Sequence, residues 1–267
     1  MRKAMTIAGS DSGAGAGIQA DLKTFSALGV YASTVITAVT AQNTMGVFGV
    51  QDIDPEMVKS QLEAVLSDIG ADAVKIGMMS SAESIGFVSE ILRQYGVEKV
   101  VLDPVITTST GFVLISSEAI SALAQKLLPI AGIVTPNIPE AEILTKTSIK
   151  DIEDMKRAAR ALYKMGVKNV LVKGGHLSGK AVDVFYDGSY HLLEAERIDT
   201  DNTHGTGCTL SSAIAAYLAR GFDMLPAVTK AKEYITGAIR HSFKVGQGHG
   251  PVNHFYATWG IKDADKL

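Results

Sequence analysis

Hydrophobic residues along this chain fall into two alternating patterns. Short apolar or β-branched runs, typical of strands buried on both faces, alternate with segments whose apolar residues recur every three or four positions, as in a helix with one buried face. The first pattern predicts strands at residues 5–8, 31–39, 73–78, 99–105, 132–135 and 169–173. The second predicts helices at residues 18–28, 55–69, 85–95, 118–128, 140–144, 151–165 and 210–218, and a last long helix with Val228, Ile235, Ile239 and Phe243 on one face.

Residues 182–186 and 190–194 differ from the rest, because they alternate apolar and polar positions around Asp187-Gly188-Ser189. This predicts a β-hairpin. Elsewhere the alternation of strands and helices predicts an α/β fold, in which helices cover both faces of a mainly parallel central sheet. No linker, low-complexity segment or internal repeat interrupts the pattern, so we expect one domain over residues 1–267.

The carboxyl ends of the predicted strands carry most of the candidate chemistry. In open α/β sheets, ligands bind beyond these ends. The residues that the pattern puts there are Asp11, Gln42, Met78, Asp103, Asn137 and Lys173. We therefore expect a binding site along this edge of the sheet.

Composition narrows the class of protein. The 267 residues are 46% hydrophobic and 20% charged, with a formal net charge of −3, which fits a globular chain and gives no sign of a nucleic-acid-binding surface. The single cysteine, Cys208, excludes an internal disulfide and fits a reducing compartment. No apolar run approaches the roughly 20 residues of a membrane span, and the N-terminus lacks a signal peptide's apolar run. We expect a cytoplasmic protein with no membrane or nucleic-acid partner.

Residues 200–213 (TDNTHGTGCTLSSA) form a glycine-containing loop that runs into a predicted helix. Such a loop leaves backbone N–H groups without partners at the helix start, where the helix dipole adds partial positive charge. Gly205, Thr206, Gly207 and Cys208 are therefore candidates for a site that binds phosphate or a developing anion. The same field predicts a lowered pKa for the Cys208 thiol. The alternative is that Cys208 is a small buried hydrophobic residue and the glycines only shape a turn.

Two glycine-rich segments approach nucleotide-binding motifs but each fails at one position. Residues 13–17 (GAGAG) follow a strand and open a helix, but Ile18 stands where a dinucleotide fingerprint needs its third glycine. Residues 174–180 approach a phosphate-binding P-loop, but Ala181 replaces the hydroxyl residue and a strand pattern follows. The missing third glycine disfavours the dinucleotide fingerprint, and we reject the P-loop. Residues 13–17 better suit a backbone that approaches a small ligand, and Asp21 in the next helix is either solvated or turned inward to bond a ligand amine.

Asp103, Asn137 and Glu140 supply oxygen atoms near the ends of consecutive strands. Mg²⁺ keeps several waters and takes one or two carboxylates, so this set suffices for a Mg²⁺–ATP complex. The alternative is ordinary capping, with Asn137 and Glu140 starting a helix. Lys173, at a strand end, is either a phosphate contact or a solvated lysine.

His204 and Cys208 are too few ligands for a structural zinc site, and little else supports a Cys–His nucleophile pair. Met78 and Met79 are either core residues or an apolar wall against an aromatic ligand.

The chain resembles the hydroxymethylpyrimidine kinase and phosphomethylpyrimidine kinase family of thiamine biosynthesis, within the ribokinase-like fold. The resemblance is carried by AGSDSGAGAGIQADLKTF (8–25), TAVTAQNT (37–44), KIGM (75–78), LDPV (102–105), TPNIPEAE (135–142), VKGGH (172–176), DVFYDG (183–188) and THGTGCTLSSAI (203–214). These segments span nearly the whole chain in order. Two positions depart from the family: Ala14 stands where glycine is usual, and residues 106–112 lack a Gly-Asp that is often present, so we assign that loop no role.

This resemblance implies a three-layer α/β/α fold, a kinase that uses ATP and Mg²⁺, and a homodimer. Its pyrimidine pocket would be lined by Asp21, Gln42, Met78 and Val105. On the nucleotide side it implies Lys173, Thr203 and His204, and for Mg²⁺ and phosphate it implies Asp103, Asn137 and Glu140. The anion hole and catalytic residues would be Gly205, Thr206, Gly207 and Cys208, with Cys208 standing where related sugar kinases carry an aspartate base.

We therefore expect ATP-dependent phosphorylation of 4-amino-5-hydroxymethyl-2-methylpyrimidine and then of its monophosphate. Amides at the helix start would stabilise the transferring group, and a thiolate at Cys208 would accept the hydroxyl proton. Gln42 offers both a donor and an acceptor, which suits an aminopyrimidine edge. The alternatives are a pyridoxal-type kinase, which Gln42 disfavours, and a non-catalytic pyrimidine-binding sensor, which the intact Cys208 loop disfavours.

Overall fold

In the computed structural model, which describes residues 1–107, 115–175, 177 and 179–258, the strands form one nine-stranded sheet. The strands are β1 Lys3–Asp11, β2 Tyr31–Asn43, β3 Gly46–Asp52, β4 Ala73–Ile76, β5 Val100–Leu102, β6 Ile133–Val134, β7 Val170–Val172, β8 Ala181–Tyr186 and β9 Tyr190–Ala195. Their order across the sheet is β3-β2-β1-β4-β5-β6-β7-β8-β9. The six strands from β2 to β7 in this order are parallel, and β3, β8 and β9 are antiparallel to their neighbours.

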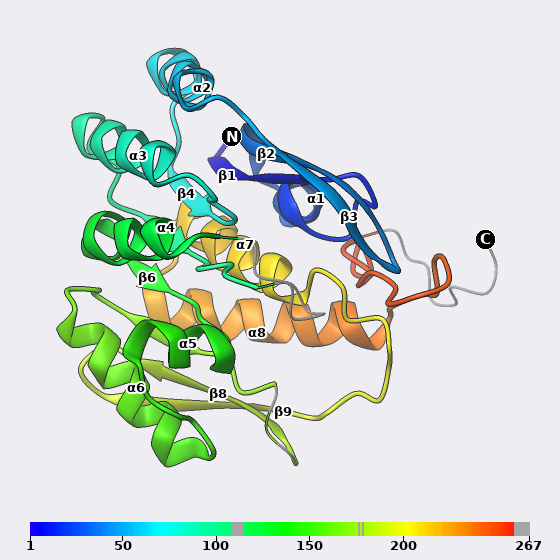
Figure 1. Cartoon of the computed structure of the whole chain (residues 1–267). Coiled ribbons are helices and arrows are strands. Elements are labelled where there is room, and N and C mark those ends of the chain that lie inside the picture. Colours follow the sequence, from blue (N-terminus) through cyan, green and yellow to red (C-terminus); the bar gives the residue numbers. More distant parts are fainter. Residues whose placement is uncertain (108–114, 176, 178, 259–267) are drawn as a thin grey trace.

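Helices cover both faces of the sheet (Figure 1). The helices are α1 Gly17–Ala27, α2 Pro55–Asp68, α3 Ala82–Gln94, α4 Ser117–Ala122, α5 Ile138–Thr145, α6 Ile152–Lys164, α7 Thr206–Ala219 and α8 Met224–Arg240. One buried hydrophobic cluster joins the sheet to α2 through α6, and a second joins its other face to α1, α7 and α8. The expected α/β/α layering with a mainly parallel sheet is confirmed.

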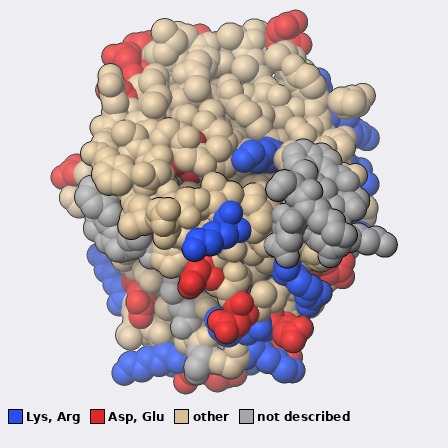
Figure 2. Space-filling model, turned by 90° about the vertical axis from the view of Figure 1, so that its right-hand side faces the viewer, with Lys and Arg blue, Asp and Glu red and all other residues tan. Residues whose placement is uncertain are grey.

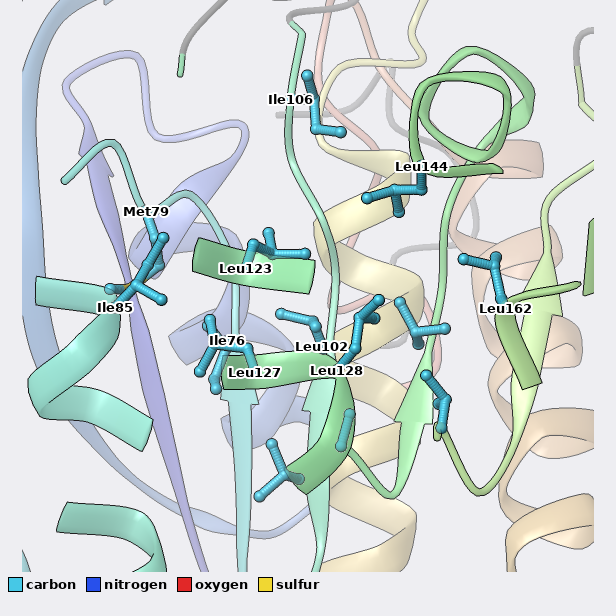
Figure 3. Close-up of a cluster of buried hydrophobic side chains, with 14 of the residues drawn as sticks. Ile76, Met79, Ile85, Leu102, Ile106, Leu123, Leu127, Leu128, Leu144 and Leu162 are labelled. Atoms are coloured by element: carbon cyan, nitrogen blue, oxygen red, sulfur yellow. The ribbon is translucent and has the colours of Figure 1, made fainter. Parts of the chain in front are cut away.

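The first cluster consists mainly of branched aliphatic side chains (Figure 3). Ile76 and Leu102, from adjacent parallel strands, are fully buried and meet side chains from the covering helices such as Ile85 and Leu127. Such strands are apolar on both faces because both faces are covered by helices. This explains why continuous apolar runs, rather than alternation, identified the parallel strands.

The predicted elements correspond to observed ones, with three differences. The segment predicted as a helix at residues 118–128 begins as α4 but continues as a π turn, Leu123–Leu127, and a 3₁₀ turn, Leu128–Ile130, which contains Pro129. Phe243 lies beyond the end of α8 and is exposed, so its predicted place on that helix face is wrong. Strand β3 was not among the predicted strands, because its side chains are mostly exposed and two of its seven residues are glycine.

The chain's path through the sheet places a topological switch point between β1 and β4, at the carboxyl ends of the strands. Strand β1 lies between β2 and β4, so the connections from β1 and β2 leave in opposite directions across the sheet. Ligands of open α/β sheets bind at such a switch point. The loop before α7 reaches the same edge, which is on the right-hand side of Figure 1 and faces the viewer in Figure 2. There, among the described residues, acidic and basic side chains are interspersed (Figure 2).

Candidate active site

Helix α7 begins at this edge with backbone N–H groups that have no acceptor among the described residues. Gly205 caps the helix in a left-handed conformation, at φ 78°, and provides no side-chain cap. The Thr206 N–H bonds to the Thr203 carbonyl, whereas within the described part of the chain the N–H groups of Gly207 and Cys208 have no acceptor. These two donors lie at the positive end of a 14-residue helix, where the sequence predicts an anion site.

The loop before α7 packs directly on the loop after β1. A Cβ added to Gly205 would overlap the Gly15 carbonyl oxygen, so no larger residue fits at this contact. The backbone N–H of Gly17 acts on the Cys208 thiol and lowers its pKa, against the effect of burial. The loop of residues 13–17 therefore packs against the loop before α7. The expected approach of its backbone to a small ligand stays a prediction.

Asp103, after β5, and Lys173, after β7, form an ion pair beside Gly207. Lys173 Nζ lies 2.8 Å from Asp103 Oδ1, and a Cβ on Gly207 would lie 3.2 Å from Lys173 Nζ. Asp103 also accepts hydrogen bonds from Thr135 and, at 3.2 Å, from Ser211 of α7. Burial opposes the charge of Asp103, but Lys173 and Lys75 outweigh it and lower the pKa of Asp103. The alternative of a freely solvated Lys173 is wrong, because only 14% of its side chain is exposed.

Asn137 and Glu140 form a reciprocal capping box at the start of α5. The Asn137 side chain accepts from the Glu140 N–H at 2.9 Å, and the Glu140 carboxylate accepts from the Asn137 N–H at 2.8 Å. Burial raises the pKa of Glu140 to about 7; Lys173 opposes this rise and Asp103 adds to it. The capping interpretation is thus confirmed. The expected role of Asn137 and Glu140 near Mg²⁺ and the phosphates of a bound nucleotide stays a prediction.

A fully buried ion pair lies near the start of α7. Lys75, in β4, places Nζ 2.8 and 2.9 Å from the two carboxylate oxygens of Asp21, in α1. Thr6 and Ser212 each donate a 2.6 Å hydrogen bond to the same carboxylate. The solvated interpretation of Asp21 is therefore wrong. The carboxylate turns inward, but its neighbours in this chain are Lys75 and two hydroxyls.

Sequence reasoning gave Lys75 no role, although a signal was present. The strand AVKI is otherwise apolar, and a charged residue in such a strand needs a buried partner. Ser211 and Ser212 were missed for a different reason: only the fold reveals that they bond Asp103 and Asp21 from one turn of α7.

The surroundings of Cys208 contradict one electrostatic expectation. Burial raises the pKa of the Cys208 thiol to about 11; Lys75 opposes the rise, and Asp21 and Asp103 add to it. The predicted lowering of this pKa by the helix start is therefore wrong. Near neutral pH the thiol is protonated, so a base at this position has to form its thiolate during the reaction.

His204 contacts Gln42, one of the residues expected to line the pyrimidine pocket. Its Nε2 is 2.9 Å from Asp11 Oδ2 and 3.4 Å from the Gln42 side-chain amide. Met78, which is 9% exposed, lies next to Gly9, where an added Cβ would be 3.3 Å from its sulfur. Val105 is partly buried after β5, and Thr203 is exposed. The loop at residues 106–112, whose sequence departs from the family pattern, lies mostly outside the described residues.

The few carboxylates at this edge of the sheet suit a metal ion whose other ligands are waters and nucleotide oxygens. Among the described residues, no group of three His, Cys, Asp or Glu side chains is arranged to hold a metal by itself. Mg²⁺ usually keeps waters and nucleotide oxygens and needs one or two carboxylates. Asp103 and Glu140, with Lys173 near both, fit that mode of binding. Within the same residues, no helix is long and apolar enough to cross a membrane.

Comparisons with known proteins agree with this geometry. Residues 11–253 match the model of a family described as phosphomethylpyrimidine kinase. The chain is 52% identical over 261 residues to a hydroxymethylpyrimidine/phosphomethylpyrimidine kinase of Rhizobium meliloti, covering 96% of this chain and 98% of that protein. It is also 52% identical to the thiamine biosynthesis bifunctional protein ThiED of Geobacter sulfurreducens, covering 97% of this chain but only 53% of that longer protein.

A solved structure shows the same fold. The ADP complex of Bacillus subtilis pyridoxal kinase superposes with a TM-score of 0.89 at 40% sequence identity, covering 95% of this chain and 97% of that one.

Proposed function

The chain belongs to the phosphomethylpyrimidine kinase family, and we propose that it transfers a phosphoryl group from ATP to 4-amino-5-hydroxymethyl-2-methylpyrimidine and then to its monophosphate, in thiamine biosynthesis. The observation that carries this proposal is the pair of unpartnered N–H groups at Gly207 and Cys208, beside the Asp103–Lys173 ion pair. Phosphoryl transfer depends mainly on positioning and charge stabilisation, and this arrangement supplies both.

The proposed roles follow from charge and position. The N–H groups of Gly207 and Cys208 would bind equatorial oxygens of the transferring group, over which its negative charge is spread in the transition state. Lys173 would add a point charge on the nucleotide side. Mg²⁺, when bound with ATP, would neutralise phosphate charge, and Asp103, Asn137 and Glu140 are the residues that would hold it.

Cys208 is the candidate for the proton acceptor. It lies in the first turn of α7, next to the N–H groups that would receive the phosphoryl group, and it also contacts the loop after β1 through Gly17. A substrate hydroxymethyl group placed there would lose its proton as it attacks phosphorus. On the substrate side, Gln42, Met78 and Val105 would contact the pyrimidine ring. Asp21 would contribute indirectly, by holding Lys75 in place beneath the pocket.

A substrate panel tests this proposal. ADP release is measured with the hydroxymethylpyrimidine, its monophosphate, pyridoxal and no acceptor. We expect turnover of the first two with kcat/KM well above that for pyridoxal. A preference for pyridoxal would favour the second candidate function, which the similarity to a pyridoxal kinase structure supports. Binding of the pyrimidine with no ATP consumption would favour a sensor.

We further propose that the protein is a homodimer and that it is cytoplasmic. Support for the first comes from β3, an edge strand, where Phe48 is 71% exposed and Met45, at the turn before it, is 62% exposed. Exposed edge strands with apolar side chains commonly pair with another chain. Light scattering of the wild type and of Phe48→Ser would test it: a wild-type mass of one chain contradicts the proposal.

A further inference from the structure

The side-chain amide of Gln42 lies between two fixed groups. One end is 3.4 Å from His204 Nε2, and the other end is 3.2 Å from Thr40 Oγ1. The amide carries an oxygen that only accepts and a nitrogen that only donates hydrogen bonds. The two neighbours therefore decide which end is which, and so which groups remain for a ligand.

The proton on His204 is determined by Asp11. The Asp11 carboxylate accepts hydrogen bonds from the N–H groups of Gly13, Gly15 and Ala16, at 2.8 to 3.0 Å. These bonds and His204 outweigh burial and lower the pKa of Asp11, so it is ionised and can only accept. His204 Nε2, which is 2.9 Å from Asp11 Oδ2, must therefore carry a hydrogen.

The Thr40 hydroxyl fixes the other end of the amide. It donates to the Ser10 carbonyl oxygen at 3.0 Å, so it has only acceptor capacity left for Gln42. An N–H on His204 and an acceptor on Thr40 both favour one orientation, with the Gln42 oxygen toward His204 and its nitrogen toward Thr40. The structure places the amide nitrogen toward His204 and the oxygen toward Thr40. The favoured orientation differs from this by a half-turn of the amide, which hardly changes its shape.

We propose that His204, held by Asp11, is a positioning residue that sets the orientation of the Gln42 amide and thereby the enzyme's choice of ring. The fixed amide retains one N–H and one oxygen lone pair for the ligand. Together they match a ring nitrogen beside an amino group, which is the edge of an aminopyrimidine. This inference rests on the proposed function, and it moves His204 from the nucleotide side, where the sequence put it, to the substrate side.

The imidazole of His204 is accommodated by a glycine in the loop after β1. A Cβ added to Gly15 would overlap Cδ2 of the His204 ring, so the absence of a side chain at Gly15 allows the ring to reach Asp11. The His204 backbone is held separately, because its N–H bonds to the Gly250 carbonyl at 3.0 Å. The ring can therefore be changed without removing the bond that anchors the loop.

The test compares two substitutions at His204. In His204→Gln, the longer side chain can place an N–H where Nε2 lies, whereas in His204→Asn the amide is too short to reach Asp11. We expect His204→Asn to raise the KM for the aminopyrimidine about 5- to 100-fold, the range for a buried polar group left without its partner, with the KM for ATP unchanged. His204→Gln should restore much of this loss. His249→Asn is the matched control, since its exposed ring bonds only the Asp201 carbonyl among the described contacts and should leave both constants near wild type.

A double-variant cycle separates positioning from a general structural effect. If His204 acts through Gln42, adding His204→Asn to Gln42→Met should change the aminopyrimidine KM little further. Gly15→Ala, which displaces the ring but keeps the imidazole, should reproduce the effect of His204→Asn. Thermal melts of every variant identify any that fail to fold, and Gly15→Ala and His204→Gln keep the test available if His204→Asn is one of them.

Each result bears on a stated claim. Additive effects of His204 and Gln42, or a rise in the KM for ATP instead of that for the pyrimidine, would overturn the inference while leaving a working pyrimidine kinase. A wild-type protein that does not phosphorylate the aminopyrimidine would overturn the proposed function, and this inference with it.

Discussion

Lys75 and Asp21 form an ion pair with no solvent exposure, in which Lys75 Nζ lies 2.8 Å from Asp21 Oδ2. The pair joins β4 to α1, and Ser212 ties it to α7 by a 2.6 Å hydrogen bond to Asp21. Burial opposes the charge on Lys75, but Asp21 outweighs it and raises the pKa of Lys75. Charge pairing therefore holds the three elements together close to Cys208.

The first prediction concerns this pair. Lys75→Met removes one partner and leaves a buried carboxylate without compensation, so we expect the free energy of unfolding to fall by about 3–5 kcal/mol. Denaturant unfolding measures the change. Lys180→Met is the matched control, because the pair Lys180–Glu194 is exposed to solvent and should contribute little to stability. Equal losses in the two variants would contradict a special role for the buried pair.

The second prediction tests Cys208 as the proton acceptor. Cys208→Ser keeps the size of the residue but removes a group that can ionise during the reaction. General-base loss typically costs about 10²–10⁴-fold, so we expect kcat to fall within that range with KM nearly unchanged. Cys208→Asp should recover part of the rate, since related sugar kinases carry an aspartate there. A folded Cys208→Ser enzyme within about threefold of the wild-type kcat, far short of a base's contribution, would show that Cys208 only packs.

Because the Cys208 pKa is raised to about 11, this role also predicts a pH dependence. Below its pKa, the thiolate fraction grows about tenfold for each pH unit, and kcat/KM reports the ionisation of the free enzyme. If the thiolate of the free enzyme is the base, kcat/KM should rise between about pH 7 and pH 9 in the wild type and lose that slope in Cys208→Ser. A flat wild-type profile would require the proton to leave only after ATP and substrate have bound.

The third prediction concerns the metal. We expect Glu140→Gln to lower activity and raise the Mg²⁺ concentration needed for half-maximal rate, because one candidate carboxylate near the phosphates is neutralised. Glutamine keeps a side-chain oxygen for the capping box, so the fold should persist. Glu142→Gln, in the same helix, is the matched control, since its carboxylate bonds only the Ile149 N–H among the described contacts. An unchanged Mg²⁺ dependence would leave Glu140 as a helix cap.

The fourth prediction follows from the Glu140 pKa, which burial raises from an ordinary 4.5 to about 7. The folded chain then holds this proton more tightly than the unfolded chain does. The associated stability is complete below about pH 4.5 and is lost as the pH rises through about 7. We expect the wild type to lose on the order of 2–3 kcal/mol relative to Glu140→Gln between about pH 5 and pH 8. A difference that stays constant across this range would rule out the raised pKa.

The fifth prediction uses a departure from the family pattern. Ala14 has a φ of 61°, in the left-handed region where a Cβ costs about 1–2 kcal/mol and where the family usually carries glycine. Ala14→Gly relieves that strain but gives the unfolded chain more freedom, which offsets about 0.4–1 kcal/mol. We therefore expect a net gain of up to about 1 kcal/mol in thermal or denaturant unfolding. A clear loss of stability would show that the Ala14 side chain makes a compensating contact.

The sequence by itself determined the layers and most of their boundaries. Apolar runs and helical spacing identify elements because burial on one or both faces is a local property of the pattern. Asp54 caps α2, and Gly29, in a left-handed conformation, follows α1. Such end signals can be read from a sequence because capping depends on neighbouring residues. The Gly205–Cys208 loop was recognised for the same reason, because unpaired N–H groups at a helix start follow from its local sequence.

Only the tertiary structure decided which residues far apart in the chain meet. The partner of Asp21 is Lys75, 54 positions away, and the partner of His204 is Asp11, 193 positions away. The Cys208 pKa is raised, against the sequence expectation, because burial outweighs the favourable charge of Lys75. Spacing along a chain predicts the field of one helix, whereas desolvation and long-range pairing depend on how all the elements pack.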